Sequence, residues 1–294
     1  MVTDQPVAIA HVSDLHFGGY ADLAQIEALE DFLPTLGVAA TVVSGDLSQR
    51  ARHGEFQAAH AFLNRIRDAM PVLAVPGNHD LEWWKSPLGV LGTAAKYTKY
   101  SRYFGPLTPV LEIPGAIIAG ALSSYGVAFG SLTWNIRDLA VKGHLPASET
   151  TRVAGIFSKA PPGTVRVLAL HHNVLAGGLS RRMGLARWRS AQRRLLATGA
   201  DVVLCGHDHQ EGAGQVQGSL AVSTAGTHSF RTRHSRPSVF NLVKIDGRAV
   251  HIQHYRWEPT GGLFLKSDTY SFARAEAPGL AVSVAGGDQE PAGG

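Results

Sequence analysis

The sequence predicts an α/β fold in which parallel strands are joined by helices. In the first eighty residues, three short apolar runs alternate with segments of helical periodicity. The polar residues that follow these runs, Asp14, Asp46 and Asn78, are separated by equal intervals of thirty-two residues, about the length of one strand–helix unit. Three further strand-like runs between residues 220 and 257 have no helices between them, which indicates an antiparallel edge or a second sheet.

The first half of the chain is expected to run strand, helix, strand, helix, strand, and then an insertion. The helices carry apolar residues three or four positions apart, as at Leu23, Ile26 and Leu29. The segment after the third strand is aromatic and basic without clear periodicity, so we expect an insertion that borders the functional site. The expected ranges are 7–12, 41–44 and 72–75 for strands, 21–36 and 53–70 for helices, and 81–110 for the insertion.

The second half is expected to continue this pattern and to end in a tail. Apolar strand character over 110–123 is broken by Pro114 and Gly115. We expect one domain over residues 1–262 and a C-terminal tail over 263–294, which is rich in Ala, Gly and Pro and disordered from about residue 273. The other expected elements are strands at 165–170, 201–205, 220–224, 238–245 and 250–257, and helices at 148–159 and 185–198.

Composition limits the kind of protein and the kind of metal site. The chain has 294 residues, of which 45% are hydrophobic and 17% charged, as in an ordinary globular protein. The single cysteine, Cys205, excludes a disulfide framework and a thiolate cluster, so a metal would be held by nitrogen and oxygen ligands that suit Mn, Fe or Zn. No apolar run is long enough for a transmembrane segment, and the N-terminus lacks a secretory pattern, so we expect a cytoplasmic protein.

Five short polar motifs, each after an apolar run, carry the chemistry. Because the carboxyl ends of parallel strands meet at one edge of a sheet, we expect these motifs to meet in space. The motifs are Asp14-Leu15-His16, Gly45-Asp46, Gly77-Asn78-His79-Asp80, His171-His172 and Gly206-His207-Asp208-His209.

The residue types in these motifs suit a pair of divalent metals. Asp14 and His16 are two positions apart at a strand end, so both side chains can point to the same side and chelate one ion. The pair His207 and His209 repeats this spacing. Asp46 has two oxygens and could bridge two ions, whereas Asn78 offers a neutral amide oxygen. The motifs together predict a two-metal site.

The ordered motifs resemble the signature of the calcineurin-like metallophosphoesterase family over about residues 7 to 257, and the layout is similar to that of bacterial cyclic-nucleotide and glycerophosphodiester phosphodiesterases. The resemblance implies two mixed β-sheets flanked by helices (αββα). It also implies that His79 contacts the substrate phosphate and assists the leaving group, and we expect Asp80 to orient it. The implied metal ligands are Asp14, His16, Asp46 and His209 for one ion and Asp46, Asn78, His171 and His207 for the other.

The expected reaction is attack on phosphorus by a hydroxide that bridges the two metals. The expected substrate is a small phosphodiester, namely a nucleotide, a glycerophosphodiester or a nucleotide lipid. The family often has His-His-Pro where this chain has His171-His172-Asn173. In the related phosphodiesterases the first histidine is the ligand, so the resemblance implies His171 here. His172 then lies behind the ligands or faces the substrate, and we add Arg50 and His228 as candidate substrate contacts because each follows a site loop or strand.

Several other functions remain open on the sequence. A pyrophosphate hydrolase of the type that acts on UDP-diacylglucosamine remains an alternative because of the apolar insertion. A phosphomonoesterase is a third enzyme candidate. A nuclease is less favoured because no added DNA-binding module is present, so we do not expect nucleic acid as a partner. A non-catalytic metal-bound scaffold is disfavoured because every ligand and His79 are retained. A homo-oligomer is compatible with the sequence.

Overall fold

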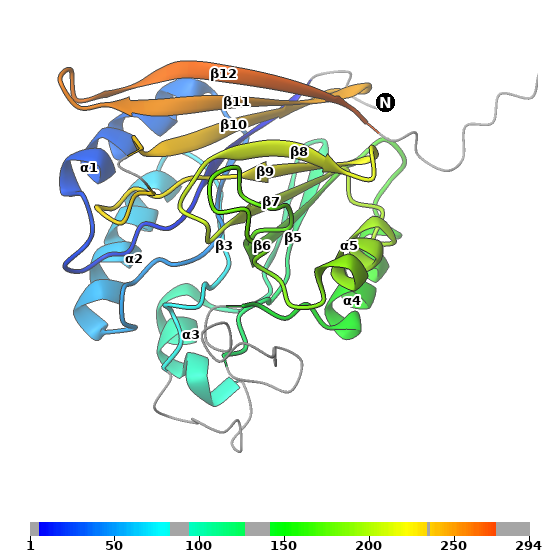
Figure 1. Cartoon of the computed structure of the whole chain (residues 1–294), viewed down its shortest axis with the longest axis horizontal. Helices are drawn as coiled ribbons and strands as arrows, with labels where there is room; N and C mark the ends of the chain where they lie inside the picture. The colour runs from blue at the N-terminus through cyan, green and yellow to red at the C-terminus, as the bar shows by residue number, and fades with distance from the viewer. Residues whose placement is uncertain (1–5, 83–93, 127–141, 234–235, 275–294) are drawn as a thin grey trace, which may run out of the picture.

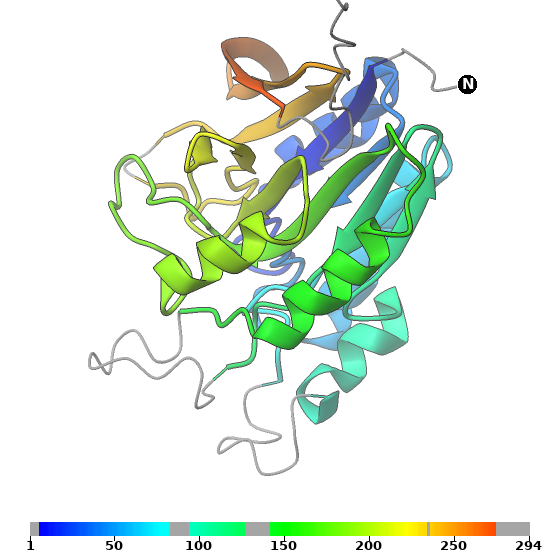
Figure 2. The ribbon, with the colours of Figure 1, turned by 90° about the vertical axis from the view of Figure 1, so that its right-hand side faces the viewer.

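Two six-stranded β-sheets pack face to face and carry helices on their outer faces (Figure 1). Helices α1 (Leu23–Phe32) and α2 (His53–Arg67) cover the first sheet, and α4 (Ala147–Phe157) and α5 (Trp188–Leu196) lie side by side over the second (Figure 2). This arrangement confirms the αββα class. The structure is a computed structural model that describes residues 6–82, 94–126, 142–233 and 236–274.

The first sheet combines three parallel strands with an antiparallel extension. The three N-terminal strands pair in parallel, as the regular strand–helix spacing predicts, and the three C-terminal strands add to β1 in antiparallel fashion. The short 3-10 helix η1 (Leu33–Leu36) continues α1. The strands, in their order across the sheet, are β12 (Leu263–Ala273), β11 (Ala249–Glu258), β10 (Val239–Ile245), β1 (Val7–Val12), β2 (Ala40–Val43) and β3 (Val72–Ala74).

The second sheet has a parallel centre and two antiparallel edges. Its four central strands are parallel, and the turn at Pro114 and Gly115 separates the first two strands as expected. One edge strand, β8, was not expected, because its Gly-Ala-Gly start offers no apolar run. The strands in order are β4 (Val110–Ile113), β5 (Ala116–Gly120), β6 (Val165–His172), β7 (Val202–Gly206), β9 (Leu220–Thr224) and β8 (Gly212–Val216).

Three apolar cores separate the four layers. Because strand side chains alternate, Ile9 of β1 packs against the other sheet, whereas Ala10 and Val12 pack against α1 and α2. A third core joins α4 and α5 to the second sheet, for example through Val153 and Leu195. The sheets are thereby fixed against each other, and the loops at their carboxyl ends can carry a rigid site.

Strand β12 shows that the predicted tail boundary at residue 263 is wrong. β12 pairs with β11 over its whole length, and Phe264 is 3% exposed against the first core. The middle of this strand is polar because it is an exposed sheet edge, which explains why its sequence does not look like a strand. Folded structure therefore continues to Ala273, and the disorder that we expect from about residue 273 concerns residues 275–294, which lie outside the described ones.

Part of the insertion at 81–110 is helical. The 3-10 helix η3 (Ala94–Tyr97) leads into α3 (Thr98–Phe104), which packs against α2. Tyr100 is fully buried, and its ring contacts that of Phe56 on α2. The aromatic residues of this stretch thus pack into the first core, and residues 83–93 lie outside the described part. Among the helices of the described residues, none has the length and apolar character needed to cross a bilayer.

Candidate metal centre

The predicted metal ligands lie on loops that follow strands of both sheets, except His171, which lies at the end of β6. Asp14 and His16 follow β1, Asp46 follows β2, and His207 and His209 follow β7. The φ angles of these five residues lie between 48° and 73°, a region that residues with side chains rarely adopt. Backbone of this kind costs on the order of 1–3 kcal/mol per residue and persists where the surrounding structure holds it, often at functional sites.

Two glycines let the ligand loops approach one another. Gly45 has a φ of 101°, and a Cβ added there would lie 2.5 Å from Nδ1 of His171. A Cβ on Gly77 would collide with the carboxylate of Asp46. Side chains at these positions would therefore push the loops after β2 and β3 away from each other and from the end of β6, and glycine is needed for the ligands to converge.

Four of the predicted ligands converge on one point. Asp14, His16, Asp46 and His209 each offer one atom, and these atoms all lie within 4.8 Å of one another. His209 Nε2 lies 3.0 Å from His16 Nε2 and 3.3 Å from Asp14 Oδ1. The other ring nitrogen of His209 donates a hydrogen bond to the main-chain carbonyl of Arg231 at 2.7 Å. Because Nδ1 carries the hydrogen, Nε2 can present a lone pair to this point.

The other three predicted ligands converge next to this group and share Asp46 with it. Asn78 Oδ1 lies 3.0 Å from both His171 Nε2 and His207 Nδ1. Asp46 Oδ2 lies 3.3 Å from His171 Nε2 and 3.8 Å from His16 Nε2. One carboxylate oxygen therefore faces both groups, which is the arrangement that a bridging ligand requires.

The atoms of the two groups suit divalent cations. Asp14 Oδ1 is buried and accepts no hydrogen bond of normal geometry in the described part of the chain. Nδ1 of His171 donates to the carbonyl of Ser44 at 2.8 Å, so a neutral His171 turns its Nε2 lone pair towards Asn78 and Asp46. Electron-rich atoms that face one another in a buried site fit a metal held by nitrogen and oxygen ligands.

In the absence of a metal, a proton on His171 takes the place of a cation beside Asp46. Burial lowers the pKa of His171, but the adjacent Asp46 carboxylate outweighs burial and the pKa rises to about 9. Burial also disfavours the charged form of Asp46, yet His171 and His79 hold the pKa of Asp46 well below its usual value. Without a metal, a proton on His171 therefore balances the Asp46 charge, and metal binding would release it.

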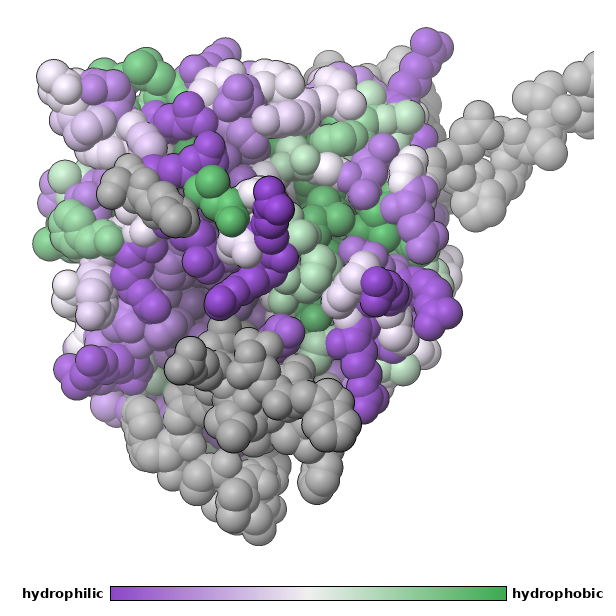
Figure 3. Space-filling view, viewed as in Figure 1, coloured by the Kyte–Doolittle hydropathy of each residue, from purple (hydrophilic) through white to green (hydrophobic). Residues whose placement is uncertain are grey.

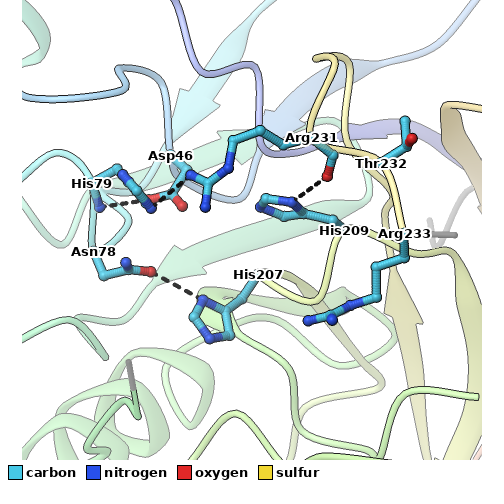
Figure 4. A pocket seen from close by; sticks show the side chains of 8 residues that line it. All are labelled: Asp46, Asn78, His79, His207, His209, Arg231, Thr232 and Arg233. Atoms are coloured by element: carbon cyan, nitrogen blue, oxygen red, sulfur yellow. Dashed lines mark hydrogen bonds between the residues drawn. The ribbon is translucent and has the colours of Figure 1, made fainter. Parts of the chain in front are cut away.

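His79 faces these groups from the loop after β3, and two neighbours fix its tautomer. Its Nδ1 lies 2.9 Å from the carbonyl oxygen of Gln49, and its Nε2 lies 3.0 Å from Nη1 of Arg231 (Figure 4). A carbonyl only accepts and a guanidinium only donates, so Nδ1 carries the hydrogen and Nε2 the lone pair. The main-chain N–H of His79 also donates to Asp46 Oδ1 at 2.8 Å, which ties the two loops together.

Asp80 does not contact the His79 ring in the way that we expected. Its fully buried carboxylate accepts hydrogen bonds of 2.8–2.9 Å from the main-chain N–H groups of Ser48 and Gly77 and from the Ser48 hydroxyl. Burial, followed by the charge of Asp46, raises the pKa of Asp80 to about 6. Asp80 therefore holds the loops after β2 and β3 together, and we correct its expected catalytic role to a positioning role.

Two of the three candidate substrate contacts are buried. His172 is buried, and its ring centroid lies 4.4 Å from that of His207, so it packs behind a predicted ligand. His228 is fully buried because its ring packs among aromatic core residues such as Phe264. Arg50 is exposed and is not among the pocket-lining residues of the described structure. Burial corrects the expected substrate contacts of His172 and His228, whereas that of Arg50 stays a prediction.

Four of the predicted ligands, which come from both groups, line a pocket of about 500 Å³. Arg231 extends over this pocket to His79 (Figure 4). Arg233 forms an ion pair of 2.8 Å with Asp208. Hydrophilic side chains cover much of the left part of the face in Figure 3, and apolar ones gather between β8 and α5. The residues that line the pocket are Asp46, Asn78, His79, His207, His209, Arg231, Thr232 and Arg233.

Two residues that contact His79 were missed by the motif reasoning. Gln49 lies three residues after Asp46, and Arg231 lies on the loop after β9. Both loops follow strands at the edge where the ligand motifs gather. Only their position on these loops could have identified Gln49 and Arg231 from the sequence.

A match over most of the sequence identifies the family of the chain. The model of the calcineurin-like phosphoesterase family matches residues 7–211. The chain therefore belongs to this family, and it is a phosphoesterase-family protein with a candidate metal site of Asp and His residues. No curated protein matches it.

Solved structures share the fold at low sequence identity. A purple acid phosphatase, PPD1, from yellow lupin (Lupinus luteus) seeds superposes with a TM-score of 0.64 at 11% identity, covering 92% of this chain and 54% of that one. The chain thus spans about half the length of the lupin protein. A dimetal phosphatase from Danio rerio gives a TM-score of 0.63 at 10% identity and covers 92% and 99% of the two chains. PhoD gives 0.64 at 10% identity, with 92% and 70% covered.

Proposed function

We propose that this protein is a dinuclear-metal-dependent phosphohydrolase that cleaves small phosphodiesters. The observation that carries the proposal is the position of Asp46, whose Oδ2 faces both ligand groups at 3.3 Å from His171 and 3.8 Å from His16. Membership of the calcineurin-like phosphoesterase family supports the reaction class. The family resemblance of the ordered motifs supports a diester over a monoester.

The chain contributes ligands, orientation and a rigid pocket to this reaction. In the proposal, Asp14, His16 and His209 hold one ion, and Asn78, His171 and His207 hold the other, with Asp46 common to both. Two such ions supply Lewis acidity and a nucleophile generated from water at neutral pH. Main-chain carbonyls orient two of the histidines, since Ser44 accepts from His171 and Arg231 accepts from His209.

His79 is the proposed group for the leaving oxygen. Its Nδ1–H donates to the Gln49 carbonyl, and its Nε2 lies in the pocket beside Nη1 of Arg231. Once Nε2 has taken up a proton, the Gln49 carbonyl still accepts from Nδ1 and so supports the charged ring. Nε2 can then donate that proton to the leaving oxygen, a contribution of roughly 10²–10⁴-fold to the rate.

Pyrophosphate hydrolysis is a second candidate, favoured by one observation. Arg231 adds a positive charge beside His79, and a simple diester carries no second negative charge to match it.

Metal dependence is the first test of the proposal. The protein is treated with chelator and assayed with bis-p-nitrophenyl phosphate and p-nitrophenyl phosphate, with and without added Mn²⁺, Fe²⁺ or Zn²⁺. We expect turnover of the diester that is lost with chelator and restored by metal. Absence of turnover with every metal, in protein shown to be folded by circular dichroism, would rule out the enzyme proposal.

A further inference from the structure

Arg231 is held in place by the same loop that supports the metal ligands. Its carbonyl accepts the hydrogen bond of His209 at 2.7 Å, and its N–H donates to the Ser229 hydroxyl at 3.3 Å. Ser229 in turn contacts the Thr227 hydroxyl, which donates to the main-chain carbonyl of Asp14. The backbone of Arg231 is therefore fixed relative to the ligand loops, and its side chain enters the pocket from a defined position (Figure 4).

No carboxylate matches the charge of Arg231 within the described residues, although its Cζ lies 5.7 Å from the centroid of the Tyr20 ring. Its Nη1 lies 3.0 Å from His79 Nε2 and 3.3 Å from Gln49 Oε1, and both of these acceptors are neutral. Among the parts of the chain that the structure describes, no carboxylate lies within 4.0 Å of it. Arg233, in the same pocket, differs because Asp208 compensates its charge at 2.8 Å.

Counting charges in the proposed site leaves Arg231 as a surplus. Two divalent ions with the carboxylates of Asp14 and Asp46 carry two net positive charges. A singly charged diester and a hydroxide nucleophile cancel these two charges. The carboxylate of Asp80 lies beside the site but is held by Ser48 and Gly77 and does not pair with Arg231. The guanidinium of Arg231 therefore has no carboxylate partner, and it is best matched by the oxygens of a phosphate or carboxylate.

We propose that Arg231 binds a second phosphate on the leaving-group side of the substrate, so that the preferred substrate is a pyrophosphate diester. This inference rests on the proposed function, because it takes His79 as the residue beside the leaving group. Arg231 lies against His79 Nε2, so an anion bound by its guanidinium would be next to the leaving oxygen. The substrate phosphate would replace the neutral contacts that Arg231 makes to His79 and Gln49.

The reaction balances as hydrolysis of a phosphoric anhydride. The oxygen of water forms a bond to one phosphorus, and the bridging P–O bond breaks. The electron pair of that bond leaves with the second phosphate, and two phosphomonoesters form. The two hydrogens of the water pass to the products or to solvent, and no oxidant or other reactant is needed.

The test compares substrates that differ in the charge of the leaving group. ADP-ribose has a leaving group that carries a phosphate, whereas bis-p-nitrophenyl phosphate has one that does not, and p-nitrophenyl phosphate places the extra charge on the scissile group. We would measure kcat and KM for the metal-loaded wild type and the Arg231→Gln and Arg231→Lys variants. Arg67→Gln is the matched control, because Arg67 is an exposed residue of α2.

We expect Arg231→Gln to lower kcat/KM for ADP-ribose by about 10- to 100-fold, the loss typical of a hydrogen bond to a charged group. The same variant should change kcat/KM for the two nitrophenyl substrates by less than about threefold. Arg231→Lys should fall between wild type and Arg231→Gln for ADP-ribose, because lysine keeps the charge but not the planar fork. An equal loss on all three substrates, a loss confined to p-nitrophenyl phosphate, or no loss on ADP-ribose would overturn the inference.

A binding measurement separates failure of the inference from failure of the proposed function. AMP, which carries the phosphate expected at Arg231, is titrated into the metal-loaded proteins by calorimetry. If wild type binds AMP about tenfold more tightly than Arg231→Gln while hydrolysing no substrate, the anion site stands and the hydrolase proposal fails. If both proteins bind AMP equally and wild type is an active diesterase, the inference fails alone.

Discussion

Asp46 and His79 divide the work of the proposed site between them at the scale of single residues. Asp46 faces both ligand groups with one carboxylate oxygen, whereas His79 belongs to neither group and has its tautomer fixed by Gln49 and Arg231. Asn78, next to His79 in sequence, contacts His171 and His207 through its amide oxygen. On this one loop, Asn78 is therefore proposed to hold metal and His79 to act on the substrate.

This division predicts different outcomes for two adjacent substitutions. His79→Ala should lower kcat for a diester with an alkoxide leaving group by roughly 10²–10⁴-fold, because a positioned acid is lost, with the bound metal unchanged. Asn78→Ala should lower both kcat and the amount of bound metal, because a ligand atom is lost. Bound metal is measured by inductively coupled plasma mass spectrometry. Equal loss of metal in the two variants would contradict the assignment of His79 as a non-ligand.

At the scale of elements, the regular strand–helix order was predictable from sequence and the edges were not. Runs such as Val7–Val12 are buried on both sides and apolar except for His11, so their strand character is plain. β12 is an exposed edge with a polar centre, and β8 begins with Gly212, Ala213 and Gly214. Edge strands have few apolar contacts, so hydrophobic pattern carries little information about them.

The same reasoning explains which parts of the site could be predicted. The ligand positions have residue types that suit metals and directly follow strong strands, so order and spacing were sufficient to bring them together. Arg231 and Gln49 have no such signature, and their roles depend on how loops fold back onto His79. His228 shows the opposite error: it follows a strand on the correct side, but its ring turns into an aromatic core.

The inclusion of β12 in the domain predicts a stability effect at Phe264. This side chain is 3% exposed, and its ring centroid lies 5.2 Å from Phe240 and 5.1 Å from Trp257. Phe264→Ala should lower the free energy of unfolding by about 3–5 kcal/mol, the usual cost of removing a buried aromatic ring. The control is the neighbouring exposed residue: Leu265→Ala should change the free energy of unfolding by less than about 0.5 kcal/mol. Similar urea midpoints for both variants would mean that β12 is not part of the cooperative fold.

At the scale of the whole molecule, a buried polar network joins the two sheets behind the metal centre. His11 of β1 bonds through Nδ1 to Ser223 of β9 and through Nε2 to Ser44 after β2, each at 2.9 Å. Asn241 of β10 donates to the same Ser223 hydroxyl at 2.8 Å. The carbonyl of Ser44 also accepts from His171. The relative position of the sheets and the orientation of a proposed ligand thus depend on one set of hydrogen bonds.

This network predicts acid sensitivity. Burial lowers the pKa of His11 to about 3 from an ordinary value of 6.5, so the unfolded state binds a proton in this pH range that the folded state does not. The contribution of His11 to stability should therefore fall by about 1.4 kcal/mol for each pH unit below 6.5. Urea unfolding at pH 7 and pH 5 should show that His11→Asn loses less stability on acidification than wild type. The exposed His53→Asn variant is the control, and an equal pH dependence in His11→Asn and wild type would contradict the prediction.

The central claim is that two metal ions share Asp46. A crystal of the protein grown with Mn²⁺ and measured at the manganese absorption edge tests it most directly, because anomalous scattering locates each ion independently of activity. We predict two anomalous peaks about 3.5–4 Å apart, one among Asp14, His16 and His209 and the other among Asn78, His171 and His207, with Asp46 between them. A single peak at full occupancy, or two peaks that do not share Asp46, would contradict the account.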